Sequence, residues 1–536
     1  MRFFMRNNFF GYIFIVFIVI ILGFAIYMVK VKNKSNEENN TSKSAVAGEV
    51  EKGKELTLAI SNFDSINPII TSNKKVQDID RLIYEPLIGI TEDYKLDYVL
   101  AKECAKTAGN TYIIKLRQAV KWSDGSKFTS DDVKFTIDKL KENSNSVYSK
   151  NVNSIQEVDI IDNYTLKIIL SSEVKHFEYY LNFPILSNSY YADTDFWNTE
   201  KNKAPTTTGR YKISEVSHST IILEKNGNWW NKESSSNIEK ITINLYSTVA
   251  EMYNAFKMGN ISIITTENPS YQNYVGTIGY DLSEIEGREY VFLALNTNSR
   301  FLSDINVRKA VRACLNKQDV INNSYGNMYS ISDFPLNKGS YLVEEKDNNY
   351  NNYDEKWNFL SSSGWYEKNG TWQKYENYRT TTLELNLVVR ASNGTRCRAA
   401  ENIKNQLQWQ GIIVNIIYAD DNSYNSYLNN VNYDMMLCSI EQPIAPDLNT
   451  YFGYNNLAKY NNQEVNEILN FVTNNTDENE LKTKYQRLYD IYNEDVPYIG
   501  IARNKTLVLK NTDLTGEIKA NWYSMFYNIG EWYTRK

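Results

Sequence analysis

The stretch YIIKLRQAVKWSDGSKFTSDDVKFTIDKL, residues 112–140, contains the signals of a strand, a turn and a helix in succession. Tyr112, Ile114 and Leu116 are apolar at every second position, and this period of two predicts a strand with one buried face. The Asp-Gly pair at residues 124–125 predicts a tight turn. The chain is therefore expected to turn back shortly after the strand.

A helix is predicted directly after that turn. Thr129 and Asp132 stand three residues apart and can form a capping box at the helix start. Val133, Ile137 and Leu140 then recur at helical spacing, which marks the buried face. Local chemistry alone thus explains how this segment folds.

Amphipathic helices continue along the chain, interleaved with strand-like runs. Val307 and Val311 mark the apolar face of one helix. On the same helix, Arg308, Lys309 and Arg312 are expected to face solvent. Further apolar helix faces are marked by Ala400, Ile403 and Leu407, by Val465, Ile468, Leu469 and Val472, and by Leu481, Tyr485, Leu488 and Tyr492. Alternation of helices and strands predicts α/β architecture.

Length and composition limit the class of protein. A chain of 536 residues exceeds what one hydrophobic core usually serves, so two or three lobes are expected. The 41 Tyr and 10 Trp against 2 His suggest rigid surfaces that hold a ligand, or simply a proteome rich in Asn, Lys and Tyr. The net charge of −6, with no long basic run outside the N-terminus, argues against a nucleic-acid partner.

The N-terminus predicts a membrane anchor. Residues 9–29 contain no charge and would span about 31 Å as a helix, which matches a bilayer's hydrocarbon core. The small-residue site AVAG at 45–48 lies too far downstream for a cleavable signal peptide, so the anchor is expected to stay. Residues 30–54 are polar and predict a flexible linker. Lysines and arginines flank both sides of the span, so its orientation stays open.

Motifs of catalysis and cofactor binding are absent from the sequence. There is no P-loop, no G-x-G-x-x-G and no G-x-S-x-G, and His176 and His218 stand outside any nucleophile motif. The four cysteines are far apart with no C-x-x-C pair, which argues against a zinc site or a disulfide-rich scaffold. We therefore expect no enzyme, no metal and no cofactor.

Eight motifs, in one order along the chain, carry a resemblance to a known family. They are LIYEPLIG (82–89), YIIKLRQAVKWSDGSKFTSDDVKFTI (112–137), TTTGRYKI (206–213), NGNWW (226–230), AFKMGNISII (255–264), VFLALNTN with INVRKAVRACLNKQDVI (291–321), NYDMML (432–437) and LYDIYNEDVPYIGI (488–501). From about residue 56 to the C-terminus, the chain resembles the extracellular solute-binding proteins of the peptide/nickel ABC-transporter family, of the oligopeptide- and dipeptide-binding type.

The resemblance implies a two-lobed clamp of the periplasmic-binding-protein type with an extra subdomain. A ligand would be enclosed between the lobes by hinge closure, and residues 122–128 would form a structural hairpin in the extra subdomain. The implied boundaries are 55–75, 207–288 and 503–536 for the first lobe, 76–206 for the extra subdomain and 289–502 for the second lobe.

Ligand-binding positions follow from the resemblance where the motifs can be traced. In the family, the loop before YEPL contacts the ligand backbone, the loop after GNISII is another loop that lines the site, and an aromatic position upstream of NYDMML can flank side-chain pockets. In this chain these positions are Ser72, Asn73 and Lys74, then Thr265, Thr266 and Glu267, then Tyr424. Each of these residues could instead be an ordinary solvated loop residue.

Charge recognition departs from the family's pattern. Peptide binders of the family hold the ligand's ammonium with an aspartate, because a buried cation needs a paired anion, but Gln442 stands at that position here. Glu441 or Asp447 could supply the charge after a shift in register. If neither does, a blocked, cyclic or non-peptide ligand is favoured. Arg396 and Arg398, placed just before the helix of Ala400, could bind a carboxylate or be merely solvated.

The resemblance implies a membrane-tethered extracellular receptor. It would act as a monomer, bind a peptide or peptide-like solute, and deliver it to an ABC permease whose ATPase is a separate chain. Because the chain has only two histidines, a directly bound nickel ion is disfavoured, although a metal inside an organic chelate stays an alternative. Another alternative is a surface sensor or peptide-handling chaperone with the same clamp and no permease.

Overall fold

The computed structural model describes residues 52–535 apart from residues 235, 346–351 and 476. The predicted anchor at 9–29 and most of the 30–54 linker lie outside this described part. Within it, no helix has both the length and the apolar content that crossing a bilayer requires.

The opening stretch folds as the sequence predicts. Strand β6 covers Thr111–Leu116, and its side chains at 112, 114 and 116 are buried. The Trp122 indole is fully buried and donates to Asp132 Oδ2 at 3.3 Å, so the hairpin at 122–128 is structural. Helix α3, Ser130–Glu142, begins with the predicted capping box, in which the Thr129 N–H donates to the Asp132 carboxylate at 2.8 Å.

Two antiparallel or mixed four-stranded sheets form the first half of the described chain. One has the order β2-β11-β10-β9, with β2 parallel to β11, and consists of Glu55–Ser61, Lys240–Tyr246, Thr220–Lys225 and Tyr211–Val216. The other has the order β5-β6-β8-β7, with β5 at Ala101–Lys106, β8 at Thr165–Leu170 and β7 at Ile155–Asp162. A two-stranded sheet pairs β3, Ile88–Ile90, with β4, Leu96–Tyr98.

These sheets share one buried apolar cluster with helices α2 and α3. Helix α2 covers Lys74–Ile83, and its residues 76, 79, 82 and 83 join the cluster. The cluster also takes in Val508, Met525 and Trp532 from the end of the chain. We call it the first core. Shorter or neighbouring helices are α4 (Ser149–Val152), α5 (Asn188–Tyr191), α6 (Val249–Lys257) and α7 (Gln272–Val275).

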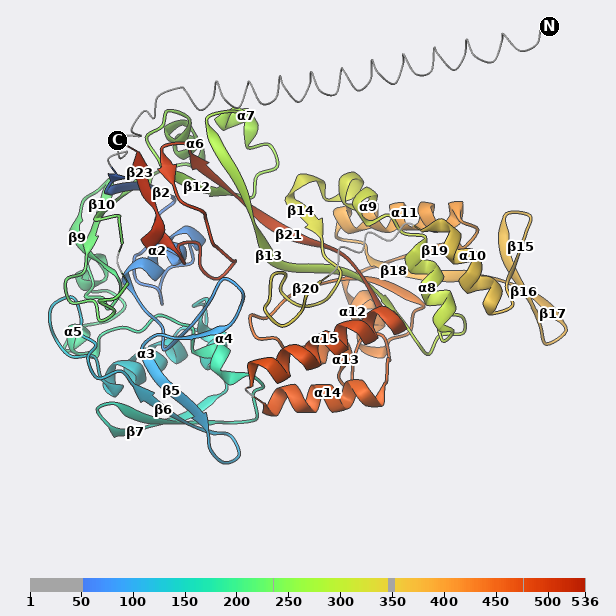
Figure 1. Ribbon diagram of the computed structural model, residues 1–536, viewed down its shortest axis with the longest axis horizontal. Coiled ribbons are helices and arrows are strands. Elements are labelled where there is room, and N and C mark those ends of the chain that lie inside the picture. Colours follow the sequence, from blue (N-terminus) through green and yellow to red (C-terminus); the bar gives the residue numbers. More distant parts are fainter. Residues whose placement is uncertain (1–51, 235, 346–351, 476, 536) are drawn as a thin grey trace, which may run out of the picture. The chain divides into compact units, whose positions relative to one another are not determined.

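The largest sheet has seven strands in the order β12-β21-β13-β20-β18-β19, with β14 added beside β21. The strands are β12 (Ile263–Thr266), β21 (Tyr498–Asn511), β13 (Tyr280–Leu295), β20 (Met435–Glu441), β18 (Glu384–Arg390), β19 (Ile413–Ala419) and β14 (Tyr329–Ile331). Figure 1 shows β13 and β21 as the two longest neighbouring strands. Both contribute to the first core at one end, through Ile285 and Val508, and to a second core at the other.

The second core consists of two buried clusters on the two faces of this sheet. Residues 291, 293 and 295 of β13 belong to one cluster, and residues 290, 292 and 294 belong to the other, as the alternation of side chains along a strand requires. Helices cover both faces: α8 (Ile305–Ala313), α9 (Lys317–Ser324), α10 (Tyr353–Ser362), α11 (Gly394–Trp409), α12 (Asp421–Asn430), α13 (Asn449–Phe452), α14 (Gln463–Asn474) and α15 (Glu478–Asp495). The predicted helices in these segments are confirmed, whereas the lobe boundaries stay predictions.

One expectation on α8 is wrong. Arg308 and Arg312 are buried, with only 6% and 9% of their surface exposed. Arg308 donates to the carbonyl of Asp495 at 2.9 and 2.7 Å and to that of Leu302 at 2.7 Å, and Arg312 donates to the carbonyl of Asn493 at 3.0 Å. The reason is that the last carbonyls of a helix, here α15, need donors from outside it.

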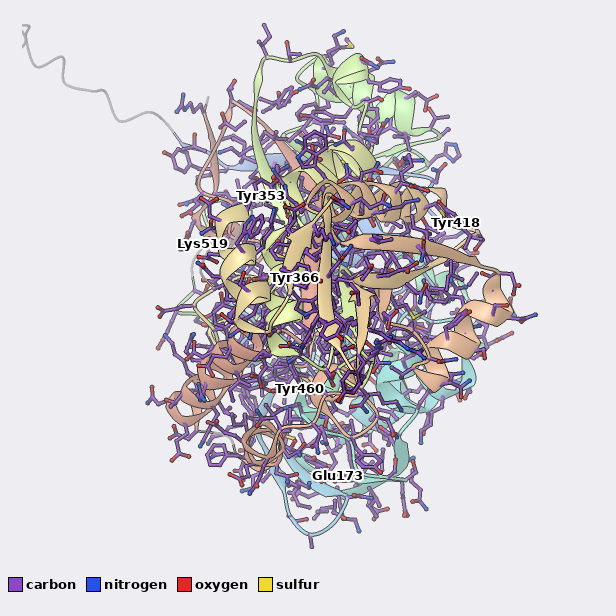
Figure 2. The ribbon with its side chains drawn as sticks, turned by 90° about the vertical axis from the view of Figure 1, so that its right-hand side faces the viewer. Glu173, Tyr353, Tyr366, Tyr418, Tyr460 and Lys519 are labelled. Atoms are coloured by element: carbon purple, nitrogen blue, oxygen red, sulfur yellow. The ribbon has the colours of Figure 1, made fainter. Side chains whose placement is uncertain are left out.

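Part of the tyrosine bias also has a structural explanation. Tyr290, Tyr492 and Tyr498 are fully buried in the second core, and each hydroxyl donates to a backbone carbonyl. Others, such as Tyr366 and Tyr418, lie on the surface (Figure 2). Tyr366 belongs to a small three-stranded sheet of β15 (Tyr366–Lys368), β16 (Thr371–Glu376) and β17 (Arg379–Thr382). Tyrosine enrichment is therefore no specific sign of a ligand site.

Candidate functional site

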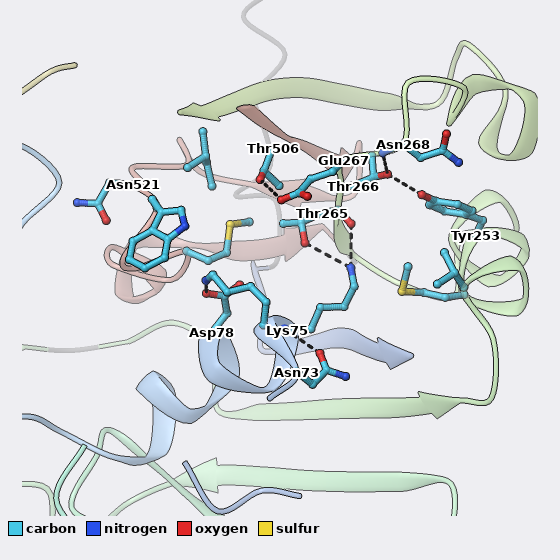
Figure 3. Close-up of a pocket in the computed structure, with 16 residues that line it drawn as sticks. Asn73, Lys75, Asp78, Tyr253, Thr265, Thr266, Glu267, Asn268, Thr506 and Asn521 are labelled. Atoms are coloured by element: carbon cyan, nitrogen blue, oxygen red, sulfur yellow. Dashed lines mark hydrogen bonds and ion pairs between the residues drawn. The ribbon is translucent and has the colours of Figure 1, made fainter. Parts of the chain in front are cut away.

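Two adjoining cavities share Lys74 and Trp522 in their walls. The first cavity, about 380 Å³, lies between the start of α2 and the loop after β12 (Figure 3). The second cavity, about 290 Å³, lies between the other side of α2 and the loop after β20. They combine residues that are more than 400 positions apart, and together they form the candidate site.

The first cavity is built on the N-terminus of α2. Asn73 caps the helix, since its side chain accepts the Lys75 N–H at 3.0 Å and donates to the carbonyl of Ser61 at 2.9 Å. Lys75 Nζ donates to the carbonyl of Thr265 at 2.8 Å, and burial lowers the pKa of this lysine. The wall is thus held by hydrogen bonds between α2 and β12, as Figure 3 shows.

The charged groups of the first cavity already have partners. Lys74 forms an ion pair with Asp78. Glu267 accepts a hydrogen bond from the Thr506 hydroxyl at 3.0 Å, and the Thr266 hydroxyl lies 2.5 Å from that of Tyr253. The first cavity therefore offers a polar surface whose charges are nearly balanced.

The second cavity takes its wall from both cores. Arg81 on α2 and Tyr148 come from the first core, whereas Glu441 ends β20 of the second and Ile444 follows that strand. The guanidinium of Arg81 lies 3.5 Å from the centre of the Tyr523 ring. A solute in this cavity would contact both parts of the protein at once.

Arg288 of β13 links the two parts in the second cavity. Its guanidinium stacks 4.5 Å above the Trp522 ring and pairs with Glu441 Oε1 at 3.2 Å. Its Nε also donates to the carbonyl of Gln442 at 2.5 Å. Because Arg288 is the partner of Glu441, that carboxylate is already compensated.

Six of the predicted site residues lie in these cavities, and five do not. Asn73, Lys74, Thr265, Thr266 and Glu267 line the first cavity, and Lys74 and Glu441 line the second. The residues that line neither are Ser72, Arg396, Arg398, Tyr424 and Gln442.

Three of the residues outside the cavities have structural partners. Ser72 lies beside the first cavity, but its N–H donates to Asp64 at 2.8 Å and its side chain is exposed. Gln442 is buried, and its amide donates to the Tyr451 hydroxyl. The Tyr424 hydroxyl donates to the carbonyl of Leu437 at 3.2 Å inside the second core.

Arg396 and Arg398 also act within the fold. Helix α11 begins at Gly394, so both arginines lie in the helix, and the expectation that they precede it is wrong. The helix starts earlier because Asn393 caps it, accepting the Arg396 N–H at 3.0 Å. Arg396 pairs with Glu289 at 2.8 Å, and Arg398 is exposed and donates to the carbonyl of Ser324 at 3.3 Å. The carboxylate of Glu289 thus already pairs with Arg396, which was predicted to bind the carboxylate of a ligand.

Several cavity residues were missed by sequence reasoning. Arg81 lies on α2 within motif-flanking sequence, Arg288 lies on β13, and Trp522 and Tyr523 lie near the C-terminus. A basic residue next to an aromatic residue in space leaves no pattern in a sequence when the two are hundreds of positions apart. Only the tertiary fold brings them together.

Two apolar cores, joined by a pair of long strands and with cavities between elements of both, are typical of proteins that bind a solute. The family model for bacterial extracellular solute-binding proteins, family 5 Middle, matches residues 95–462. The chain belongs to this family. It is accordingly the substrate-binding component of an ABC importer of the peptide/nickel type, and not an enzyme.

Relatives and solved structures agree with this membership. The oligopeptide-binding protein AppA of Bacillus subtilis (strain 168) is 21% identical over 526 residues, covering 94% of this chain and 95% of that protein. The structure of a nickel ABC transporter protein from Bacillus halodurans matches with a TM-score of 0.73 at 18% identity, covering 90% of this chain and 100% of that one. MppA, a periplasmic murein tripeptide binding protein in its unliganded open form, matches with a TM-score of 0.74 at 16% identity, covering 90% and 98%. The fold is thus the mixed α/β periplasmic-binding-protein fold of this family.

Proposed function

We propose that the protein captures a peptide or peptide-like solute in the two adjoining cavities and delivers it to an ABC permease with a separate ATPase. One observation carries the proposal: the cavities share Lys74 and Trp522, and the second is walled by elements of both cores. A solute there would favour the arrangement in which the cores are held together, and such differential binding is what drives closure.

Similarity supports a peptide-like solute. One relative that matches over nearly the whole of both chains is named for binding oligopeptides, and MppA is named for binding a murein tripeptide. Within the cavities, Asn73, Lys74, Thr265, Thr266, Glu267 and Glu441 are the proposed ligand contacts. The remaining sequence candidates are proposed to support the fold instead.

The proposal includes the cellular arrangement predicted from the sequence. Residues 9–29 would anchor the chain in the cell membrane as a single span, and residues 30–54 would tether the described part outside the cell. One span holds a protein at a membrane far more durably than a single acyl chain does. The lobes would then meet the permease without diffusing away.

Native mass spectrometry of the full chain, as purified, tests the proposal directly. We expect a co-purifying guest of peptide-like mass, and a rise in melting temperature when the emptied protein is mixed with a defined peptide library. An oligosaccharide library of equal concentration is the control. A guest that is not peptide-like, together with no stabilisation by any peptide, contradicts the proposal.

Crosslinking in intact cells tests the partner. Recovery of a permease supports delivery to a transporter. Recovery of only a kinase or a secretion component would instead support a surface sensor or chaperone.

A further inference from the structure

We propose that the second cavity selects a solute that carries a carboxylate and no free ammonium group, such as an acidic peptide whose amine is blocked or cyclised. This inference rests on the proposed function and deepens it. It follows from the charges, the hydrogen bonds and the aromatic rings that line this one cavity.

Cations outnumber carboxylates in the cavity wall. Among the described residues that line it, the cations are Lys74, Arg81, Lys150 and Arg288, and the one carboxylate is Glu441. Lys74 is neutralised by Asp78 and Arg288 by Glu441. In the part of the chain that the structure describes, Arg81 and Lys150 have no ion pair with a carboxylate. The cavity therefore keeps a positive excess that a solute anion would offset.

Arg81 shows this excess most clearly. Its guanidinium lies flat against the Tyr523 ring at 3.5 Å, and its Nη2 is 3.4 Å from the Tyr148 hydroxyl. Its Nε is buried without a hydrogen-bond acceptor. A half-buried guanidinium that makes no ion pair offers an incoming carboxylate a charge-assisted hydrogen bond.

Among the described residues that line the cavity, the one carboxylate is already paired with an arginine, so none is free to receive an ammonium. Gln442 is neutral, and its side chain points into the second core toward Tyr451. Glu441 is held by Arg288 and is largely exposed to solvent. An ammonium group would lose its hydration beside two arginines without gaining an anion, so a free amine is disfavoured.

Aromatic rings supply another part of the wall. Tyr148, Tyr179, Tyr180, Trp522 and Tyr523 surround the cavity. Such rings pack against apolar or planar parts of a ligand at little entropic cost. The expected solute therefore combines an apolar or aromatic body with a carboxylate.

Three tripeptides of one length test the inference by isothermal titration of the full chain at pH 7. The first is N-acetyl-glycyl-phenylalanyl-glutamate. The second is N-acetyl-glycyl-phenylalanyl-glutamine amide, and the third is the same glutamine amide with a free amine. We expect the acidic probe to bind at least tenfold more tightly than the neutral one, and the free-amine probe to bind most weakly. The advantage of the acidic probe should shrink as salt is added.

Variants assign the effect to the cavity. Arg81→Gln should abolish the advantage of the acidic probe over the neutral one, and Arg81→Lys should restore part of it. Arg487→Gln, at an exposed arginine paired with Glu464 on the surface, is the matched control and should change nothing. If Arg81→Gln fails to fold by circular dichroism, Lys150→Gln replaces it and should reduce the same advantage.

Different outcomes contradict different claims. If the free-amine probe binds as tightly as the acidic one, the inference is overturned and the proposed function stands. If none of the three probes binds at millimolar concentration while peptides of the library do stabilise the protein, the inference is again overturned and the proposed function stands; if no peptide of the library stabilises the protein either, the proposed function itself is contradicted.

Discussion

Arg308 stabilises the fold through the carbonyl groups that its guanidinium satisfies. It reaches Leu302 before α8 through a buried contact and Asp495 at the end of α15 through a partly buried one. Arg308→Met would leave these carbonyls without donors, so the free energy of unfolding should fall by about 3 kcal/mol. Lys309→Met, next to it and less buried, should change it by less than about 0.5 kcal/mol. Urea unfolding followed by circular dichroism measures both, and equal losses would contradict the capping role.

Glu85 makes the stability depend on pH. Burial raises the pKa of its carboxyl from 4.5 to about 7, although the indole N–H groups of Trp229 and Trp230 oppose part of this shift by donating to it. The folded protein therefore keeps this proton up to about pH 7, whereas the unfolded chain releases it near pH 4.5. The stability that Glu85 contributes is therefore fully present below pH 4.5, the pKa in the unfolded chain, and is lost as the pH rises through about 7, the pKa in the folded protein.

The pH dependence of Glu85 can be measured against a variant. Between pH 4.5 and pH 7 the wild type should lose on the order of 3 kcal/mol of unfolding free energy through this group. Glu85→Gln stays neutral throughout, so its stability should vary less by that amount. Glu103→Gln, at an exposed carboxylate, should keep the wild-type profile. Parallel profiles for wild type and Glu85→Gln, from urea unfolding at several pH values, would refute this assignment.

At the scale of elements, the pair β13 and β21 contains a local irregularity where it passes between the cores. The register shifts between Glu286 and Tyr290, and Gly287 lies in that shift. A Cβ at Gly287 would collide with the Asn504 side chain, whose Oδ1 accepts the Glu289 N–H at 2.9 Å. Gly287 thus permits the close approach of the two strands.

Gly287→Ala should therefore lower the unfolding free energy by about 2 kcal/mol through overpacking. Asn504→Ala in the same chain removes the colliding amide and should recover part of that loss. Gly227→Ala is the control, because nothing lies near its added Cβ. Thermal unfolding compares Gly287→Ala, the double variant with Asn504→Ala, and Gly227→Ala. If Asn504→Ala recovers none of the loss, the collision with the Asn504 side chain is not its cause.

Elements whose signals are local were predictable, and contacts between distant elements were not. The strand at 112–116, the capping box of Thr129 and the faces of α14 and α15 follow from neighbouring residues. Arg308 looked like a surface residue because the carbonyl that it satisfies lies 187 positions away. Gln442 looked like a ligand contact because sequence does not show that Tyr451 holds it in the core.

The candidate site, too, was predictable only where its residues belong to a local sequence motif. Loop candidates near α2 and β12 do line the first cavity, since motif and cavity share those elements. Arg81, Arg288 and Trp522 were not predicted as site residues, because their proximity depends on how the two cores pack against each other.

At the scale of the whole molecule, three polar contacts join elements of the two cores. The Tyr341 N–H donates to the carbonyl of Asp93 at 2.9 Å, Lys175 donates to Asn449 at 2.9 Å, and Lys95 pairs with Glu478 at 3.1 Å. These three contacts are polar and partly exposed, so each is weak, and a small buried cluster that includes Tyr94, Tyr179 and Ala445 also joins the two parts. If binding requires these contacts to open, locking one of them should trap or exclude the solute.

A disulfide between residues 93 and 341 provides that lock, because their backbones lie within hydrogen-bonding distance and the four native cysteines are free. In the variant Asp93→Cys with Tyr341→Cys, oxidation should slow binding and release of the best of the three tripeptide probes at least tenfold, and reduction should restore both rates. Asp93→Cys alone is the control and should be insensitive to oxidation. Stopped-flow tryptophan fluorescence measures the rates. Unchanged rates in the oxidised double variant would mean that the solute enters without separation of the cores, and hinge closure would have to be abandoned as the mechanism.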